Sequence, residues 1–243
     1  MILKQHVISI VTVVYNAAET LDLTMSSVLN QTYKNIEYII IDGGSTDGSL
    51  EIIKKYESRL SSFISEQDDG IYNAMNKGID LANGDWIYFL GADDILFSPL
   101  IIQELVVKFK DLDGIYYGNA YLRNAHRMYN GQINKWSIAL GNISHQAIFY
   151  PKSRFKNKKY DESYKLLADH IYNIELYKDY SNSFIYIPTI VAIYNDLGRS
   201  SINIDLKYEK NIISVIQKNL GFMCGLYVWT RRLLYSFQKN KKK

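Results

Sequence analysis

The stretch "GDWIYFLGADDIL", residues 84–96, contains a strand-like run that is followed directly by two acidic residues. Trp86 to Leu90 form an apolar and aromatic run that suits a buried strand, and the carboxylates of Asp93 and Asp94 follow directly. Two adjacent acids at this point can cap the helix expected near Pro99, or they can serve a binding site at the edge of a sheet. The pair alone does not separate these two interpretations.

Three runs upstream of this stretch are also strand-like. "VISIVTVVY" (7–15) and "IEYIIID" (36–42) are apolar without alternation, as is typical of strands covered on both faces, and a short strand is expected near Phe63. Helical patterns separate the strands, around residues 21–29, 47–56 and 71–81, and another follows Pro99. This alternation predicts an α/β fold with a mostly parallel sheet and helices on both faces.

The second half of the chain is less regular. Strands are expected at 114–122 and 145–150, a helix at 164–178, a pair of strands within 184–195, and a loop at 197–201.

Composition limits the class of protein. The chain has 243 residues, of which 47% are hydrophobic and 22% charged, as in soluble globular proteins. The single cysteine, Cys224, excludes an internal disulfide and favours a reducing compartment. The N-terminus lacks a signal-peptide cleavage site, and no run reaches the ~20 apolar residues that span a bilayer. We therefore expect a cytoplasmic protein.

Polar residues gather where the expected strands end. In open α/β sheets, ligands bind outside the carboxyl ends of the strands, so these residues would share one crevice. Several carboxylates in one crevice repel one another unless a cation or hydrogen-bond donors offset the charge, and Mg²⁺ or Mn²⁺ fits such oxygen ligands. The residues at the four strand ends are Thr12 and Asn16, Asp42 to Asp47, Glu66 with Asp68 and Asp69, and Asp93 with Asp94.

The order of these clusters resembles a known family. "VVYNAAETLDLTMSSVLNQTYKNIEYIIIDGGSTDGS" and "EQDDGIYNAMNKGIDLANGDWIYFLGADD" are similar to the nucleotide-binding half of family 2 glycosyltransferases with the GT-A fold. "SHQAIFY" and "LLADHIYNIEL" resemble later parts of the branch that builds bacterial surface polysaccharides. The resemblance covers roughly residues 6–201. It implies a GT-A catalytic domain at 1–204, with a nucleotide-sugar-binding half at about 1–97 and an acceptor-binding half at 98–204.

The resemblance also implies roles on the donor side. Thr12, Val14 and Asn16 would line the nucleoside, and Asp42 would bind the base, usually uracil. The family's metal-binding D-x-D motif appears here as Ala92-Asp93-Asp94, so Asp94 is the expected metal ligand and Asp93 would face the ribose. A loop and the helix after it would close over base, ribose and phosphates through Glu66, Asp68, Asn76 and Lys77. Alternatively, the acidic loop only caps this helix and Lys77 is a solvated lysine.

On the acceptor side the resemblance implies that Asp169 is the general base. Inverting transfer needs one base to take the proton of the acceptor hydroxyl, while the leaving diphosphate needs only charge stabilisation. Leu166, Leu167 and Ala168 precede Asp169, and such apolar surroundings would raise the pKa of its carboxyl group. His145, Gln146 and Arg199 would contact the acceptor or the diphosphate. Taken alone, Asp169 would be a solvated residue on a helix and His145 a structural histidine.

The carboxy-terminal segment, 205–243, has a different character. The formal net charge is +3, but no acidic residue follows Glu209, whereas eight basic residues do; residues 1–209 carry 20 basic and 25 acidic residues, a net charge of −5. Phe222, Leu226, Trp229 and Leu233 recur at helical spacing, and Phe237 continues the stripe. A basic amphipathic helix of this kind suits an anionic membrane surface, and otherwise it packs on the catalytic domain. Nucleic acid is not an expected partner, because an acidic crevice repels phosphate.

The sequence therefore predicts a metal-dependent inverting glycosyltransferase. It would move a sugar from a nucleotide sugar, with UDP as the expected nucleotide, to a hydroxyl of a lipid-linked or growing glycan at the inner face of the cell membrane. Two alternatives remain: a nucleotidyltransferase and a non-catalytic nucleotide-binding module. The first usually has a basic glycine-rich loop after its first strand, and "TVVYNAAETL" contains neither glycine nor lysine. No G-x-G-x-x-G follows a strand, which disfavours dinucleotide binding.

Overall fold

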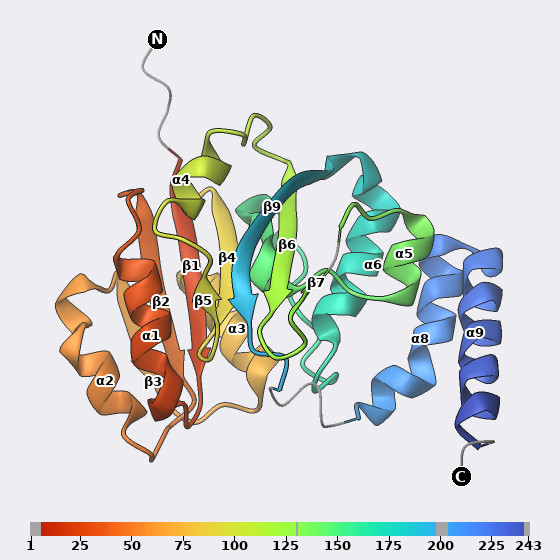
Figure 1. The fold of residues 1–243 in the computed structure, drawn as a ribbon, viewed down its shortest axis with the longest axis horizontal. Coiled ribbons are helices and arrows are strands. Elements are labelled where there is room, and N and C mark those ends of the chain that lie inside the picture. The colour runs from red at the N-terminus through yellow and green to blue at the C-terminus, as the bar shows by residue number, and fades with distance from the viewer. Residues whose placement is uncertain (1–5, 130, 198–203, 241–243) are drawn as a thin grey trace.

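The computed structural model describes residues 6–129, 131–197 and 204–240. Within these residues one sheet of nine strands runs through the molecule in the order β3-β2-β1-β4-β8-β6-β9-β5, and β7 pairs with β6. Figure 1 shows helices on both sides of this sheet, and two C-terminal helices at the end of the molecule away from β3. The mixed α/β architecture confirms the predicted fold class.

The first half of the sheet is parallel. Its strands are β1 (Ile8–Val14), β2 (Ile36–Asp42), β3 (Ser62–Ser65) and β4 (Trp86–Gly91), and all pair in parallel with their neighbours. The connecting helices are α1 (Ala18–Leu29), α2 (Ser49–Lys55) with the short turn η1 (Glu57–Arg59), and α3 (Ile71–Leu81). All lie where the sequence predicts them.

Burial on both faces explains the continuous apolar runs. Ile8 and Ile10 of β1 pack into one core cluster with residues of α1, whereas Val11 packs on the opposite face with residues of α3. Alternate residues of a strand point to opposite faces, so a strand covered on both sides must be apolar throughout.

The second half of the sheet is mixed. β8 (Ile148–Pro151) runs antiparallel to β4 and β6, and β5 is antiparallel to β9, whereas β6 and β9 are parallel. The strand expected at 145–150 begins as a turn, and the helix expected at 164–178 begins at Ala168.

The sequence did not predict β7 or α5. The remaining elements are β5 (Ile95–Leu96), α4 (Ile101–Val106), β6 (Ile115–Leu122), β7 (Arg127–Tyr129), α5 (Lys135–Leu140), η2 (His145–Ala147), η3 (Lys152–Phe155), α6 (Ala168–Tyr180), η4 (Ser181–Ser183) and β9 (Phe184–Tyr194).

The prediction of two strands within 184–195 is wrong, because β9 is a single strand of 11 residues. The interruption in the sequence is Pro188, and the ladder between β6 and β9 shifts register at this point, opposite Gly118. A proline is tolerated inside a strand where the hydrogen-bond ladder is interrupted. A Cβ atom at Gly118 would lie 2.7 Å from the Thr189 carbonyl oxygen, so the two backbones approach closely here.

The carboxy-terminal segment forms two helices rather than one. α8 (Leu206–Leu220) buries Tyr208, Ile212 and Ile216 in the core cluster that also contains residues of α6. The hydroxyl of Tyr208 and the Nδ1 atom of His170 on α6 are 2.6 Å apart and share a hydrogen bond. α9 (Phe222–Asn240) packs on α8 and α5. Among the described residues, no helix has the length and hydropathy of a membrane span.

Candidate active site

The carboxyl ends of the parallel strands lie side by side. In the ladders, Val14 of β1 pairs with Asp42 of β2, Asp42 pairs with Ser65 of β3, and Val13 pairs with Gly91 of β4. The acidic segments that follow these strands therefore emerge at one edge of the sheet. This is the shared edge that the sequence predicts.

At the end of β2, the side chain of Asp42 is buried and fully engaged. Its Oδ2 atom accepts a hydrogen bond of 2.6 Å from the Ser65 hydroxyl, and Oδ1 accepts one of 2.5 Å from the Ser45 hydroxyl. The backbone N–H of Asn16, which has a φ of 49°, donates to the same Ser45 hydroxyl. Asp42 thus joins three loops at the strand ends, and a nucleoside base would have to compete with Ser45 or Ser65 for it.

The side chains of Thr12 and Val14 point into the protein. Thr12 is buried with its hydroxyl 3.2 Å from the Tyr38 hydroxyl, and Val14 belongs to the core cluster beside α1. They do not line an open site in this structure. The exposed side chains at the end of β1 are those of Tyr15 and Asn16, so these two are better placed to meet a ligand.

The loop before α3 carries an ion-pair cluster. Lys77 Nζ lies 2.5 Å from Asp68 Oδ1 and 2.7 Å from Glu66 Oε1. Burial acts to lower the pKa of Lys77, but the hydrogen bonds and charges of the two acids outweigh it and raise the pKa. A Cβ atom on Gly43 would approach Asp68 Oδ2 to 3.0 Å, so this cluster borders the β2 end.

Asn76 has a different environment from Lys77, against the expectation that both face the site. Its amide donates to Glu162 Oε1 (2.8 Å) and to the Tyr160 carbonyl (3.0 Å), and it accepts from the Tyr160 backbone N–H. Asn76 therefore fastens α3 to the segment at 160–162, which is a structural role.

At the end of β4, the two adjacent acids differ sharply. Asp94 is 0% exposed; its Oδ1 accepts from the Asn195 backbone N–H (2.7 Å) and its Oδ2 from the Gln146 amide (2.6 Å). Asp93 is only half-buried and accepts from the Asn195 side-chain amide at 2.9 Å. Helix capping by this pair is excluded, because the N-cap of α4 is Leu100 and has no side-chain hydrogen bond.

The side chain of Asp169, in the first turn of α6, is also buried. Its Oδ1 accepts a hydrogen bond of 2.7 Å from the Tyr72 hydroxyl, and its Oδ2 accepts one of 2.6 Å from the Asn142 amide. His145 Nδ1 lies 3.7 Å from the same Oδ2 atom. Asp169 is therefore not the solvated helix residue that its position in the sequence alone would suggest.

The turn η2 connects the two buried acids. Its consecutive residues, His145 and Gln146, contact Asp169 and Asp94 respectively. Gln146 is held in place by the Ser144 hydroxyl, which donates to its Oε1 atom at 2.6 Å. The end of β4 and the start of α6 thus face each other across η2.

The pKa values on the two sides of η2 move in opposite directions. Burial, with the neighbouring charge of Asp93, raises the pKa of Asp94 to about 6. Burial also acts to raise the pKa of Asp169, but the neighbouring imidazole of His145, with the hydrogen bond from the Tyr72 hydroxyl, holds it below its usual value. This corrects the expectation that apolar surroundings raise the pKa of Asp169.

The pKa of His145 is raised. Burial alone would lower it, but the nearby carboxylate of Asp169, together with the charges of Asp94 and Asp93, outweighs burial. The site therefore favours a protonated imidazole next to an ionised Asp169.

Few side chains in the site could bind a metal ion. Among the described residues, no three His, Cys, Asp or Glu side chains gather closely enough to hold an ion by themselves. Mg²⁺ and similar ions, however, commonly take one or two carboxylates and complete their coordination with substrate phosphates and water. The half-exposed carboxylate of Asp93 fits this arrangement, whereas Asp94 is 0% exposed and its carboxylate is held by Gln146 and Asn195.

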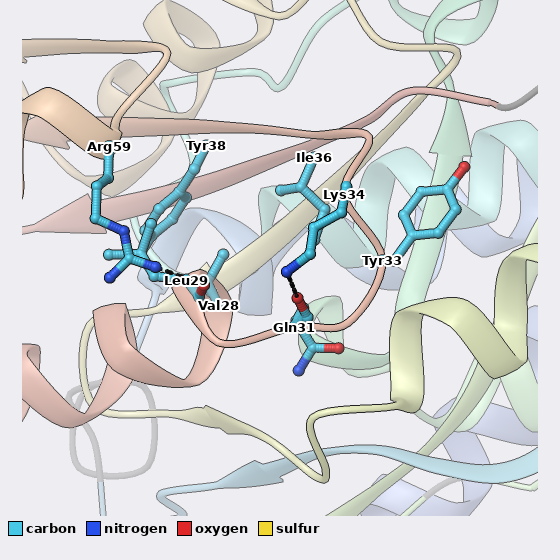
Figure 2. A pocket seen from close by; sticks show the side chains of 8 residues that line it. All are labelled: Val28, Leu29, Gln31, Tyr33, Lys34, Ile36, Tyr38 and Arg59. Atoms are coloured by element: carbon cyan, nitrogen blue, oxygen red, sulfur yellow. Dashed lines mark hydrogen bonds between the residues drawn. The ribbon is translucent and has the colours of Figure 1, made fainter.

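A pocket lies at the other end of the sheet from the candidate site (Figure 2). It borders Ile36, the first residue of β2, whereas the candidate site borders Asp42, the last. Its cations are engaged, since Lys34 donates to the Gln31 carbonyl and Arg59 to the Leu29 carbonyl. This pocket brings no acids together and is not a candidate for the chemistry.

Some site residues escaped prediction, and one cannot be placed. Arg199 lies outside the described residues. Tyr72, Asn142 and Asn195 contact the predicted acids but come from distant parts of the chain. Only Asn195 had a sequence signal, since it directly follows a strand as the acids do.

Comparisons with known proteins identify the family of this chain. Residues 9–181 match the model of the family "Glycosyl transferase family 2". A "PGL/p-HBAD biosynthesis glycosyltransferase" of Mycobacterium bovis is 31% identical over 212 residues, which cover 84% of this chain and 83% of that protein.

Solved structures show the same fold at low sequence identity. S. aureus TarS 1-349 in complex with UDP-GlcNAc has a TM-score of 0.70 and 16% identity, over 88% of this chain and 66% of that one. The mannosyltransferase PcManGT from Pyrobaculum calidifontis, in complex with GDP-Man and Mn2+, has a TM-score of 0.62 and 13% identity, over 82% of this chain and 59% of that one. This chain thus spans two thirds or less of both solved chains.

The family match covers more than half of the chain. The chain belongs to glycosyl transferase family 2 and has the GT-A fold.

Proposed function

We propose that this enzyme is an inverting glycosyltransferase that moves a sugar from a nucleotide sugar, with UDP as the nucleotide, to a hydroxyl of a lipid-linked or growing glycan in surface polysaccharide biosynthesis. The observation that carries the proposal is η2, where His145 contacts Asp169 and Gln146 contacts Asp94. This turn sets a proton acceptor opposite the edge of the sheet at which a donor would bind. TarS in complex with UDP-GlcNAc supports the choice of nucleotide.

Asp169 is the proposed general base. Its lowered pKa keeps it ionised at neutral pH, and each oxygen retains a lone pair besides those used by Tyr72 and Asn142. The acceptor hydroxyl would give its proton to Asp169 as its oxygen attacks the anomeric carbon. Attack from the face opposite the leaving group inverts the configuration.

His145 would stabilise the leaving diphosphate. Its raised pKa favours the protonated imidazolium, and its side chain is about a quarter exposed, at 27%. A cation next to the developing negative charge lowers the barrier, because the leaving group needs no proton.

A divalent ion, Mg²⁺ or Mn²⁺, when bound, would supply further charge neutralisation at the diphosphate. Asp93 is the residue that would hold it, in place of Asp94, whose carboxylate the fold uses internally. The Mn2+ in the PcManGT complex supports such a requirement. On the donor side, Tyr15, Asn16 and Asp68 would contact the nucleoside.

The experiment is a panel of nucleotide sugars offered to the purified chain, with and without Mn²⁺, and read by release of free nucleotide. We expect one UDP-sugar to be turned over, and only with the metal present. Turnover of a GDP-sugar alone would correct the nucleotide. Release of pyrophosphate from a nucleoside triphosphate and a sugar phosphate would instead establish a nucleotidyltransferase, and binding without turnover a non-catalytic module.

A further inference from the structure

The helix α9 turns its most apolar face away from the protein. Phe222, Leu226, Trp229, Leu233 and Phe237, which we call the outer stripe, are 36–66% exposed. The side that packs on α8 is the smaller one, formed by Cys224, Gly225, Val228 and Arg232.

Helix geometry places the centres of these two sets on different sides of α9. Successive residues of an α-helix are about 100° apart, so Leu226 lies about 200° from Cys224. The contact with α8 is close, since a Cβ atom on Gly225 would come within 2.1 Å of the Gln217 side chain, and Arg232 pairs with Glu209 at 2.8 Å. α9 is therefore docked in a defined rotation that leaves the side chains of the outer stripe at least 36% exposed.

The apolar surface continues onto α5. Trp136 packs edge-to-face on Tyr227 of α9 with their ring centroids 5.5 Å apart, and both Trp136 and Leu140 are 45% exposed. Exposed apolar side chains gathered on two helices that pack together are typical of a binding surface.

The charge beside this surface is positive. Lys135, which precedes Trp136 on α5, is exposed, and "KNKKK" ends the sequence, while neither α5 nor the sequence after Glu209 contains an acidic residue. Two copies meeting through this face would bring like charges together. An anionic surface would instead be attracted to it.

We propose that the outer stripe of α9, with Trp136 and Leu140 of α5, docks on an anionic lipid bilayer, with α9 lying in the interface. Trp and Tyr side chains favour the headgroup level, and Leu and Phe the acyl boundary. Figure 1 places α9 at the outer end of the molecule, with its C-terminal end on the side toward which β1 runs, where the candidate site lies. The inference does not depend on the proposed chemistry.

The test is co-sedimentation of the full chain with vesicles, without donor or acceptor. We expect binding to phosphatidylglycerol/phosphatidylcholine vesicles and much weaker binding to phosphatidylcholine alone. The variant Trp229→Gln/Leu233→Gln/Phe237→Gln should lose binding by about tenfold or more, because it removes three side chains that the bilayer would bury. These residues are exposed, so folding should be preserved, as circular dichroism would verify.

The matched control is Leu23→Gln/Val107→Gln/Leu112→Gln, which removes three exposed apolar side chains elsewhere and should bind like the wild type. Equal binding by both triple variants would overturn the proposal. So would a wild-type dimer in sedimentation velocity that only the α9 variant dissociates, since the stripe would then join two copies. Glycosyl transfer is not measured, so failure here and failure of the proposed function are separate results.

Discussion

Two buried carboxylates, Asp94 at the end of β4 and Asp169 at the start of α6, face each other across η2 and behave differently. Both lose water on folding and both accept two short hydrogen bonds. The pKa of Asp94 is raised to about 6, whereas that of Asp169 is lowered. The difference comes from the neighbours: Asp94 lies beside the like charge of Asp93, and Asp169 beside the imidazole of His145.

From this contrast we propose different roles for the two acids. Asp94 has a structural role, because its hydrogen bonds connect the end of β4 with η2 and with the end of β9. Asp169 has a lowered pKa and lies beside His145, whose pKa is raised, which supports the proposal that Asp169 is the base. Burial alone therefore does not identify a catalytic acid or base, and the groups around it do.

The largest expected effect is on the acceptor side. Asp169→Asn removes the proposed base, so sugar transfer should fall by about 10²–10⁴-fold, the usual contribution of general base catalysis. UDP binding, measured by calorimetry, should stay close to wild type. The control is Asp179→Asn, the same change at an exposed position of α6. Equal transfer by the two variants would remove Asp169 from the mechanism.

On the donor side, Asp93→Ala should abolish the dependence of UDP binding on Mn²⁺. Asp93 is the half-exposed acid of the pair. Loss of a side chain that only hydrogen-bonds to a metal ligand weakens metal binding by about 10–100-fold, so loss of the ligand itself should weaken Mn²⁺-dependent UDP binding by at least that much. Titration calorimetry of UDP with and without Mn²⁺ measures this. Unchanged metal dependence would show that Asp93 is not the ligand.

Asp94→Ala should act on stability first. It leaves the Gln146 amide and the Asn195 backbone N–H without an acceptor, which costs about 1–3 kcal/mol for each buried unsatisfied group. Urea unfolding should show a clear loss for Asp94→Ala and little change for Asp93→Ala. The reverse order would contradict the distinction between the two acids.

The smallest effect concerns the pH profile. Tyr72→Phe removes a donor that helps to lower the pKa of Asp169. A base is active above its pKa, and the pKa of Asp169 in the folded protein is below its usual value. In the wild type, protonation of Asp169 should therefore reduce kcat/KM only at low pH. In Tyr72→Phe the acid limb of kcat/KM should move to higher pH, with a smaller change on the alkaline side. An unmoved acid limb would mean that Asp169 does not set it.

The sequence predicted the parallel half of the fold well for a physical reason. β1, β2 and β4 are covered on both faces, so they appear as unbroken apolar runs with polar residues at their ends. The convergence of those ends follows from parallel pairing alone. β9 was misread because Pro188, which usually ends a strand, sits where the ladder shifts register.

The identities of the partners could not be predicted. Asp93 and Asp94 are adjacent in the sequence. What gives Asp94 its structural role is its hydrogen bonds with Gln146 and Asn195, which lie 52 and 101 residues further along the chain. Likewise, the apolar sequence neighbours of Asp169 suggested a raised pKa, but Tyr72 and His145 determine its direction. The outer stripe of α9 was visible as a pattern, whereas its outward direction depends on how α9 packs on α8.

The most direct test is the anomalous-scattering position of Mn²⁺ in crystals grown with UDP. The account predicts one manganese at the carboxyl ends of the strands, bound by Asp93 and the diphosphate, with the diphosphate on the side that faces His145 and Asp169. Manganese and UDP at the opposite end of the sheet, in the pocket beside Ile36 and Lys34, would contradict it.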